Sequence, residues 1–166
     1  MTTTTTKTLK DGTTSVEAPA DLPVIRMTRE FAATPAQLFR AHTEAELFAR
    51  WMGPADSDLE ITQWDPRSGG SWRYESVFGT EKFSFRGCFH TVREDRIVET
   101  FTYEAMPDAV CLETFTFEEL GEGRTLLRSE SLYETFEARD FMLTSMESGV
   151  IDGYASLDRM LAASEL

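Results

Sequence analysis

The stretch TPAQLFRAHTEAELFARWMGP, residues 34–54, contains two helix starts and one abrupt stop. The Thr-Pro pair at 34–35 places a capping side chain before a proline at the first helical position, and the T-x-x-E sequence at 43–46 has the spacing of a capping box. The Gly-Pro pair at 53–54 ends the second helix, because neither residue favours its continuation. The stretch therefore predicts two helices of about two turns each, the second of which ends on Trp51.

From Leu59 onwards the apolar pattern has a period of two, which is typical of strands. One further strand, at about residues 24–31, precedes the two helices. The later runs are separated by turn sequences such as PRSGG and GEG, at a spacing typical of an antiparallel meander. They span residues 59–65, 71–79, 82–92, 97–105, 110–120 and 124–133.

The later strands divide into an aromatic and a polar face. Phe101, Tyr103, Phe115 and Phe117 share one parity. The other parity is occupied by Thr100, Thr102, Glu104, Thr114, Thr116 and Glu118. Such a pattern is typical of a sheet that is covered on one side only. The segment from about 137 to 163 supplies the cover, because its apolar residues recur at steps of three and four over about seven helical turns.

Gly149 and Gly153 lie on or beside this helical stripe. A glycine within a helix costs about 1 kcal/mol relative to alanine, so the pair needs a physical reason. Two interpretations stay open from the sequence: close approach of the helix to the sheet, or room left for a ligand.

The chain has 166 residues, of which 41% are hydrophobic, enough for one domain with a substantial core. Residues 1–22 are rich in Thr, Ala and Pro without apolar periodicity, which indicates a disordered N-terminal tail before a domain at 23–166. The formal net charge of -13 argues against nucleic acid and anionic membrane surfaces as partners. With no apolar run long enough for a membrane span and no signal-peptide core, the expected location is cytoplasmic.

Four segments of the chain resemble a known family. They are FAATPAQLFRAHTEAELFARWMGP at 31–54, GGSWRYES at 69–76, FRGCFHTVREDRIVETFTYE at 85–104 and RDFMLTSMESGVIDGYASLDRMLA at 139–162. In this order they are similar to the START-like, or SRPBCC (Bet v 1-like), superfamily. The most similar branch is named after the activator of the heat-shock-protein-90 ATPase and is often grouped with polyketide-cyclase-like proteins.

The resemblance implies an α+β helix-grip fold. In this fold a curved antiparallel sheet, here of about seven strands, wraps round a long C-terminal helix, with the two short helices between strands 1 and 2. It also implies an elongated apolar cavity between sheet and helix, the usual form of a small-molecule site.

Aromatic side chains and two methionines of the covering helix are the ligand-binding residues that this fold implies. For each of them, plain core packing is the alternative. They are Trp51, Trp64, Trp72, Tyr74, Phe85, His90, Phe101, Tyr103, Phe115, Met142, Met146 and Tyr154.

His90 has two interpretations, because it shares its strand parity with Arg86 and Cys88, opposite to the neighbouring phenylalanines. If the phenylalanines face the helix, His90 lies on the outer surface. If the polar parity lines the cavity, His90, Arg86 and a nearby carboxylate could form an acid–base group. A register shift at Gly87 would decide between them, and the sequence leaves both open.

The leading functional hypothesis is binding of a small hydrophobic or amphipathic molecule, such as a lipid, a polyketide or an aromatic metabolite. One alternative is a cyclase, dehydratase or hydrolase that uses a polar group in the cavity, and another is an interaction protein similar to the chaperone ATPase activators. The sequence has no phosphate loop, nucleophile elbow or HExxH zinc motif. No cofactor or metal is therefore expected, and catalytic residues are unknown. A homodimer stays open, and a chaperone partner is disfavoured without being excluded.

Overall fold

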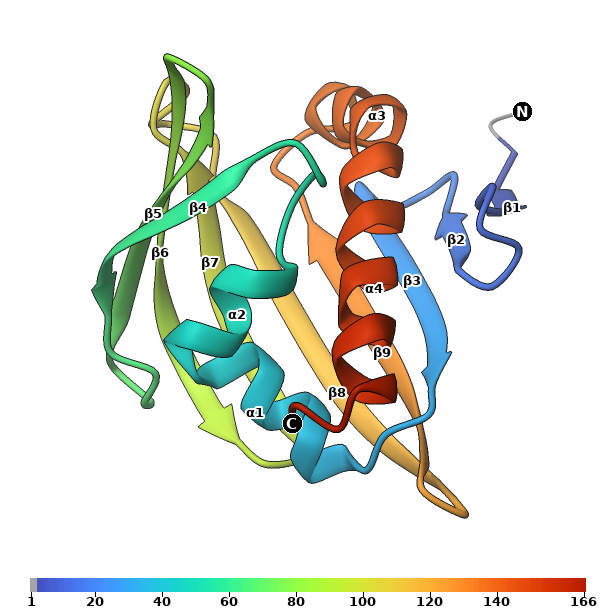
Figure 1. Ribbon diagram of the computed structural model, residues 1–166. Coiled ribbons are helices and arrows are strands. Elements are labelled where there is room, and N and C mark those ends of the chain that lie inside the picture. The colour runs from blue at the N-terminus through green and yellow to red at the C-terminus, as the bar shows by residue number, and fades with distance from the viewer. Residues whose placement is uncertain (1–2) are drawn as a thin grey trace.

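The computed structural model describes residues 3–166 as one antiparallel sheet with four helices (Figure 1). The sheet has nine described strands in the order β1-β2-β3-β9-β8-β7-β6-β5-β4, so strands β4 to β9 form the expected meander. The strands are β1 (Thr5–Thr8), β2 (Ser15–Ala18), β3 (Val24–Phe31), β4 (Asp58–Trp64), β5 (Ser71–Phe78), β6 (Glu81–Arg93), β7 (Arg96–Tyr103), β8 (Cys111–Gly121) and β9 (Arg124–Leu132).

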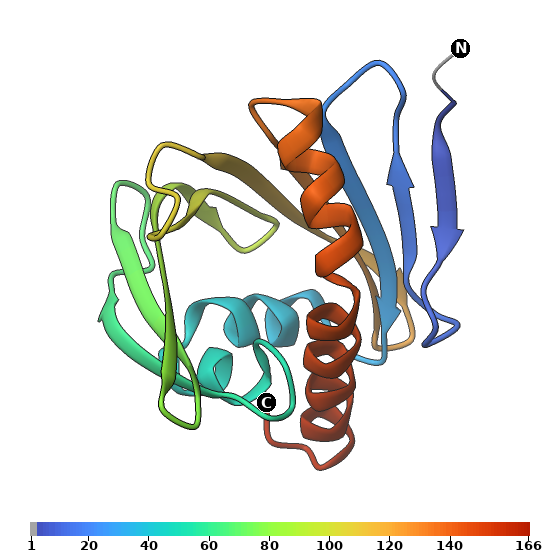
Figure 2. The same ribbon diagram turned by 90° about the horizontal axis from the view of Figure 1, so that it is seen from above.

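The helices lie on the concave side of this sheet. They are α1 (Pro35–Thr43), α2 (Ala45–Trp51), α3 (Phe136–Ser145) and α4 (Glu147–Ala162). Figures 1 and 2 show α4 crossing the sheet, while α1 and α2 lie together at one end of it. This arrangement confirms the α+β helix-grip fold, with nine strands instead of about seven.

The first short helix begins as its sequence predicts, and the second does not. Thr34 Oγ1 accepts a hydrogen bond from the Gln37 amide, and Gln37 Oε1 accepts one from the Thr34 amide, which completes a capping box. The capping box expected at 43–46 is absent, because Thr43 belongs to α1 and its hydroxyl donates to the Phe39 carbonyl. Helix α2 therefore begins without a side-chain cap and depends on packing.

The N-terminal segment corrects the expectation of a disordered tail over residues 1–22. Strands β1 and β2 form a hairpin that extends the sheet beyond β3, and only residues 1–2 of the expected tail lie outside the described residues. The Asp11 carboxylate accepts hydrogen bonds from the Thr13 and Thr14 amides and shapes the turn region. Val16 is buried with Leu9 against β3. Three buried apolar residues, Leu9, Val16 and Ala18, and one side-chain-bonded turn were too sparse a signal to be recognised in the sequence.

The C-terminal helix is interrupted at Met146, where the sequence predicts one continuous helix. The hydroxyls of Thr144 and Ser145 both donate to the Phe141 carbonyl, at 2.9 and 2.6 Å, and so compete with helix continuation. The Phe141 side chain is 65% exposed, so it does not belong to the apolar stripe.

Helix α4 is fixed to the sheet and to α2 by a few specific contacts. Arg29 on β3 donates two hydrogen bonds to the Asp158 carboxylate, at 2.9 and 2.6 Å. At Gly153, an added Cβ would come within 3.0 Å of the Trp51 carbonyl oxygen. The missing side chain thus permits close approach of α4 to the end of α2, and the expected partner, the sheet, is not involved. The Trp51 ring stacks on Tyr154 with centroids 6.1 Å apart, so it fills the closed end of the sheet.

Candidate functional site

Two glutamates of the central strands face each other on the concave side of the sheet. Glu99 of β7 is paired directly with Glu113 of β8. Each shares its strand parity with inner-face phenylalanines, and each side chain is half-buried. Directly opposed residues of an antiparallel ladder have Cβ atoms roughly 4.5–5.5 Å apart. We call Glu99 and Glu113 the inner carboxylate pair.

Two polar side chains of neighbouring strands meet the inner carboxylate pair. Ser131 Oγ on β9 donates to Glu113 Oε1 at 3.2 Å. The Trp72 indole on β5 is 3% exposed, and its effect on Glu99 opposes the rise in the pKa of that carboxyl. Its Nε1 nevertheless has no hydrogen-bond partner among the described residues. The inner carboxylate pair thus accepts one hydrogen bond, from Ser131, while the nearby Trp72 N–H remains without a partner among the described residues.

Gly87 of β6 makes room for this indole. A Cβ at Gly87 would come within 2.6 Å of two ring carbons of Trp72, and within 1.9 Å of the Thr100 carbonyl oxygen. Trp72 and Gly87 are cross-strand partners, so the ring lies over the glycine instead of over a side chain. This close approach places the indole N–H beside the inner carboxylate pair.

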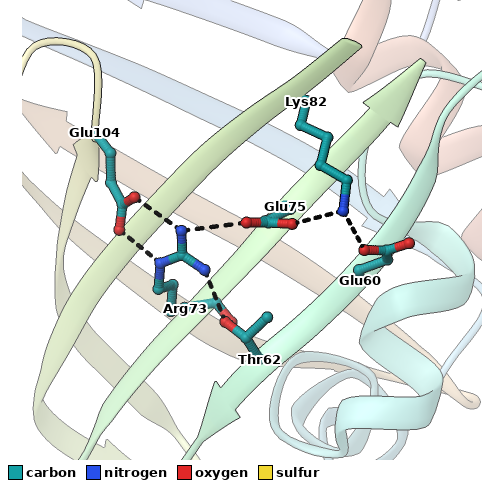
Figure 3. Close-up of polar contacts among 6 residues, drawn as sticks. All are labelled: Glu60, Thr62, Arg73, Glu75, Lys82 and Glu104. Carbon is teal, nitrogen blue, oxygen red and sulfur yellow. Dashed lines mark hydrogen bonds and ion pairs between the residues drawn. The ribbon is translucent and has the colours of Figure 1, made fainter. Parts of the chain in front are cut away.

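Three glutamates of the outer face, Glu60, Glu75 and Glu104, have cationic partners. Figure 3 shows Arg73 donating to both oxygens of Glu104, at 2.7 and 2.9 Å, and Lys82 lying between Glu75 and Glu60. These contacts lower the pKa of Glu75 and Glu104. Within residues 3–166, by contrast, no ion pair includes a member of the inner carboxylate pair. The inner face therefore holds negative charge that the protein itself does not neutralise.

This environment raises the pKa of both glutamates of the pair. Burial and the neighbouring charge of Glu113 raise the pKa of Glu99 well above that of an ordinary glutamate. Burial raises the pKa of Glu113 to about 7, against the opposing effect of the Ser131 hydrogen bond. The two groups titrate as a coupled unit, which keeps its protons to a higher pH than two ordinary glutamates would. Such a pair can hold, accept or donate a proton at a ligand.

A connected group of aromatic rings lies beside the inner carboxylate pair, and we call it the ring ladder. Its ring centroids are 5.2 Å apart for Trp72 and Tyr74, 5.4 Å for Tyr74 and Phe85, and 5.3 Å for Phe85 and each of its other two neighbours. Its members are Trp72, Tyr74, Phe85, Phe101 and Tyr103, all from the predicted ligand-binding set.

Part of the ring ladder remains accessible to water. Trp72 and Tyr74 are buried, but Phe85, Phe101 and Tyr103 are only half-buried although they face the concave side. The backbone of α4 approaches α2 more closely than it approaches any strand. The helix therefore does not cover these rings fully.

The other predicted aromatic site residues share one core with Trp72 and Tyr74 of the ring ladder, whereas the two methionines lie in a second cluster. Trp51, Trp64 and Tyr154 lie in the core at the closed end, where each indole N–H is used by a carbonyl of α1: Ala41 for Trp51 and Thr43 for Trp64. Phe115 packs against the same core. Met142 and Met146 pack on a second cluster formed with β2 and β3.

His90 lies on the outer surface, as the first of its two interpretations predicts. It is exposed, and its Nδ1 is 2.8 Å from Thr91 Oγ1. Arg86 and Cys88 are exposed on the same face. They line a hollow of about 360 Å³ that is open to solvent on the side of the sheet opposite to the inner carboxylate pair. An acid–base group of His90 with inner-face carboxylates is therefore ruled out by the strand parity.

The inner carboxylate pair is the part of the site that the sequence analysis missed. A signal was present, because Glu99 and Glu113 share the parity of Phe101 and Phe115, where an apolar residue is expected.

Among residues 3–166, no three His, Cys, Asp or Glu side chains are grouped to hold a metal ion. No described helix combines the length and apolar character needed to cross a bilayer.

Comparison with known proteins agrees with this fold. The family model described as Activator of Hsp90 ATPase homolog 1-like protein matches residues 32–162. No curated protein matches the chain.

Solved structures extend the likeness over most of the chain. A crystal structure of a Rhodobacter sphaeroides protein has a TM-score of 0.81 and 26% identity, and covers 90% of this chain and 99% of its own. An Arthrobacter aurescens protein has a TM-score of 0.79 and 22% identity, with coverages of 89% and 91%. An HSP90 activator from Plasmodium falciparum has a TM-score of 0.58 and 18% identity, with coverages of 84% and 96%. The last two likenesses show the fold alone.

Proposed function

The chain belongs to the family of Activator of Hsp90 ATPase homolog 1-like proteins, and on that premise we propose that it binds a small hydrophobic or amphipathic molecule on its inner face. This family lies within the START-like superfamily, whose domains are ligand-binding domains in general. The proposed site lies between the ring ladder and α4. A lipid, a polyketide or an aromatic metabolite has the required apolar body.

The observation that supports this function is the half-burial of Phe85, Phe101 and Tyr103 on the concave side of the sheet. Inner-face side chains that pack against the helices are buried, as Phe117 and Leu127 are. The exposed ring surface is therefore available to a ligand. Each 100 Å² of apolar surface that a ligand covers contributes roughly 2.5 kcal/mol, so a molecule that covers several rings gains useful affinity.

Thermal-shift measurements and native mass spectrometry with a panel of apolar compounds test this function. We expect at least one compound to raise the melting temperature of the full chain. The Phe101→Ala variant should lose that shift, because it removes a wall of the ring ladder. Leu112→Ala serves as the matched control, since Leu112 is 40% exposed on the outer face. The absence of any shift across lipids, polyketides and aromatic metabolites would rule the function out.

A second candidate function, acid–base catalysis on the bound molecule, is favoured by the inner carboxylate pair. A coupled pair that holds one proton can take a proton from a carbon acid and return it. Incubation with aryl and alkyl ketones in D₂O, followed by proton NMR, measures this as exchange of hydrogens next to the carbonyl. Exchange should occur faster with the wild-type protein than with Glu99→Gln. Equal rates for both proteins and for buffer alone would exclude this chemistry for those ketones.

A further inference from the structure

The inner carboxylate pair has the geometry of a two-pronged acceptor. Its members extend from neighbouring strands onto the same face, directly opposite each other in the β7–β8 ladder. A head group with several N–H donors could contact both carboxylates at once. Across the neighbouring strands, Glu99 is paired with Phe89 of β6 and Glu113 is paired with Ser131 of β9. The acceptor therefore lies between an aromatic residue and a hydroxyl-bearing one.

The protein provides no cation for this acceptor. Arg29 is a buried cation on the same face of the sheet. It is already paired with Asp158 at 2.6 Å and lies 3.9 Å from Asp11, so it is not available to Glu99 or Glu113. Removing charged carboxylates from water without a partner is costly. A cationic ligand removes that cost, whereas an apolar or anionic ligand leaves or increases it.

The Trp72 indole supplies a second, independent observation. It is nine-tenths buried, its Nε1 has no acceptor among the described residues, and it faces Glu99. An N–H donor in this place favours the ionised form of Glu99. The protein thus directs a fixed donor at one carboxylate and leaves the open side of the pair to a ligand.

The surroundings of the pair suit an organic cation in two further ways. The faces of aromatic rings attract cations, and the ring ladder lies directly beside the carboxylates. The net charge of -13 attracts cationic solutes and repels anionic ones, such as fatty acids, at a distance.

We propose that the ligand is an amphipathic organic cation, with a protonated amine, amidinium or guanidinium group held between Glu99 and Glu113 and its apolar body against the ring ladder. This inference rests on the ligand-binding function proposed above and names the chemical class of its ligand. It separates cationic amphiphiles from the neutral and anionic ones that an apolar site alone would also accept.

Binding should strengthen as the pH rises, because a cation displaces the proton that the pair retains. The other titratable groups that face the pair do not change charge between pH 5.5 and 8. Burial raises the pKa of the hydroxyl and thiol groups and lowers that of His42 to about 4, and Arg29 stays paired with Asp158. The neutral groups with raised pKa are Tyr74, Cys111, Tyr133 and Tyr154.

Isothermal titration calorimetry with two matched series of compounds tests the proposal. The aromatic series is tryptamine, tryptophol and indole-3-propionate, and the aliphatic series is decylamine, decanol and decanoate. Within a series the body is constant and the head group is cationic, neutral or anionic. At pH 8 we expect the amine of at least one series to bind roughly tenfold or more tighter than its alcohol, with a smaller preference at pH 5.5.

Variants of the two glutamates, and the number of protons released on binding, test whether the preference for amines arises at the inner carboxylate pair. The Glu99→Gln and Glu113→Gln variants should each reduce the amine preference and leave the binding of the alcohol unchanged. Glu118→Gln is the matched control, because Glu118 lies on the outer face of β8 and is paired with Arg128. In the wild-type protein, titration in buffers of different ionisation enthalpy should show proton release on amine binding at pH 6.5, a readout that does not depend on any variant folding.

The outcomes separate this inference from the proposed function. An alcohol or carboxylate that binds as tightly as the amine, or an amine preference that survives Glu99→Gln and Glu113→Gln together, would overturn the cation assignment and leave apolar binding intact. Failure of both series and of the apolar panel above would overturn the function and the inference together.

Discussion

Glu99 and Glu113 face each other across the β7–β8 ladder, on the concave side of the sheet, with no cationic side chain paired to either within residues 3–166. This relationship distinguishes the inner face from the outer one. On the outer face Arg73 and Lys82 pair with Glu60, Glu75 and Glu104 (Figure 3). The same residue type is therefore neutralised by its neighbours on one face and left to solvent, protons or a ligand on the other.

The first prediction concerns the pH dependence of stability. The pKa of Glu113 rises from 4.5 to about 7 on folding, so the folded state retains a proton that the unfolded state has released. The stability from this proton is complete below about pH 4.5 and is lost as the pH rises through 7. Urea unfolding should show Glu113→Gln to be more stable than the wild type by roughly 1–2 kcal/mol at pH 8, and nearly equal to it at pH 5. A difference that stays constant with pH would contradict the raised pKa.

The second prediction concerns Ser131, which donates to Glu113 and thereby restrains the rise of its pKa. In Ser131→Ala the carboxyl of Glu113 should titrate higher than in the wild type, by roughly one pH unit. Carbon-13 NMR of the glutamate carboxyl groups measures this directly. Ser129→Ala is the control, because the Ser129 hydroxyl has no hydrogen-bond partner among the described residues. Equal shifts in both variants would show that the Ser131 hydroxyl is not responsible.

The third prediction uses the two glycines of α4 as a matched pair. Alanine at Gly153 would place its Cβ 3.0 Å from the Trp51 carbonyl oxygen, whereas at Gly149 its nearest contact is Pro54 at 3.9 Å. Gly149→Ala should therefore raise the free energy of unfolding by up to about 1 kcal/mol through helix propensity. Gly153→Ala should lose that gain and destabilise the protein. Thermal unfolding of both variants gives the comparison, and an equal stabilisation would exclude a close contact between α4 and α2.

The fourth prediction concerns the attachment of α4 to the sheet. Arg29 is 8% exposed and donates two hydrogen bonds to Asp158. Asp158→Asn should cost roughly 2–4 kcal/mol of unfolding free energy, because the charge of Arg29 would remain buried without its main partner. The exposed pair of Arg124 and Glu30 provides the control, and Arg124→Gln should change stability by less than about 1 kcal/mol. Similar small losses in both variants would show that the buried pair does not fix the helix.

Much of the fold could be predicted from local patterns. The cap at Thr34, the Gly-Pro stop after Trp51 and the alternation of the later strands each express a preference of a few adjacent residues. Such preferences act within a turn of helix or along one strand, so they are visible without the rest of the molecule. The helix break at Met146 was not predicted, because the apolar stripe continues across it. The hydroxyls of Thr144 and Ser145, which compete with the helix, are a weaker signal in the sequence.

The candidate site was predicted only in part. Trp72, Tyr74, Phe85, Phe101 and Tyr103 were all expected to line it, and the structure brings them together in the ring ladder. Trp51, Trp64, Phe115 and Tyr154 lie in the same core as Trp72 and Tyr74, but Met142 and Met146 pack in a second cluster instead of beside the ring ladder. Aromatic composition does not distinguish a ring that packs against a helix from a ring that faces open space.

The sequence by itself determined most helices and strands, because capping, turn and period-two patterns are local, and its resemblance to a known family implied their helix-grip arrangement. It also carried the parity that sends Glu99 and Glu113 to the aromatic face. Only the tertiary structure decided that these two residues are cross-strand partners, that Arg29 is engaged by Asp158, and that the Trp72 indole N–H is buried without a hydrogen-bond partner among the described residues. The charge and the free donor of the site depend on contacts between residues far apart in the chain, which strand register and helix docking set and no local pattern encodes.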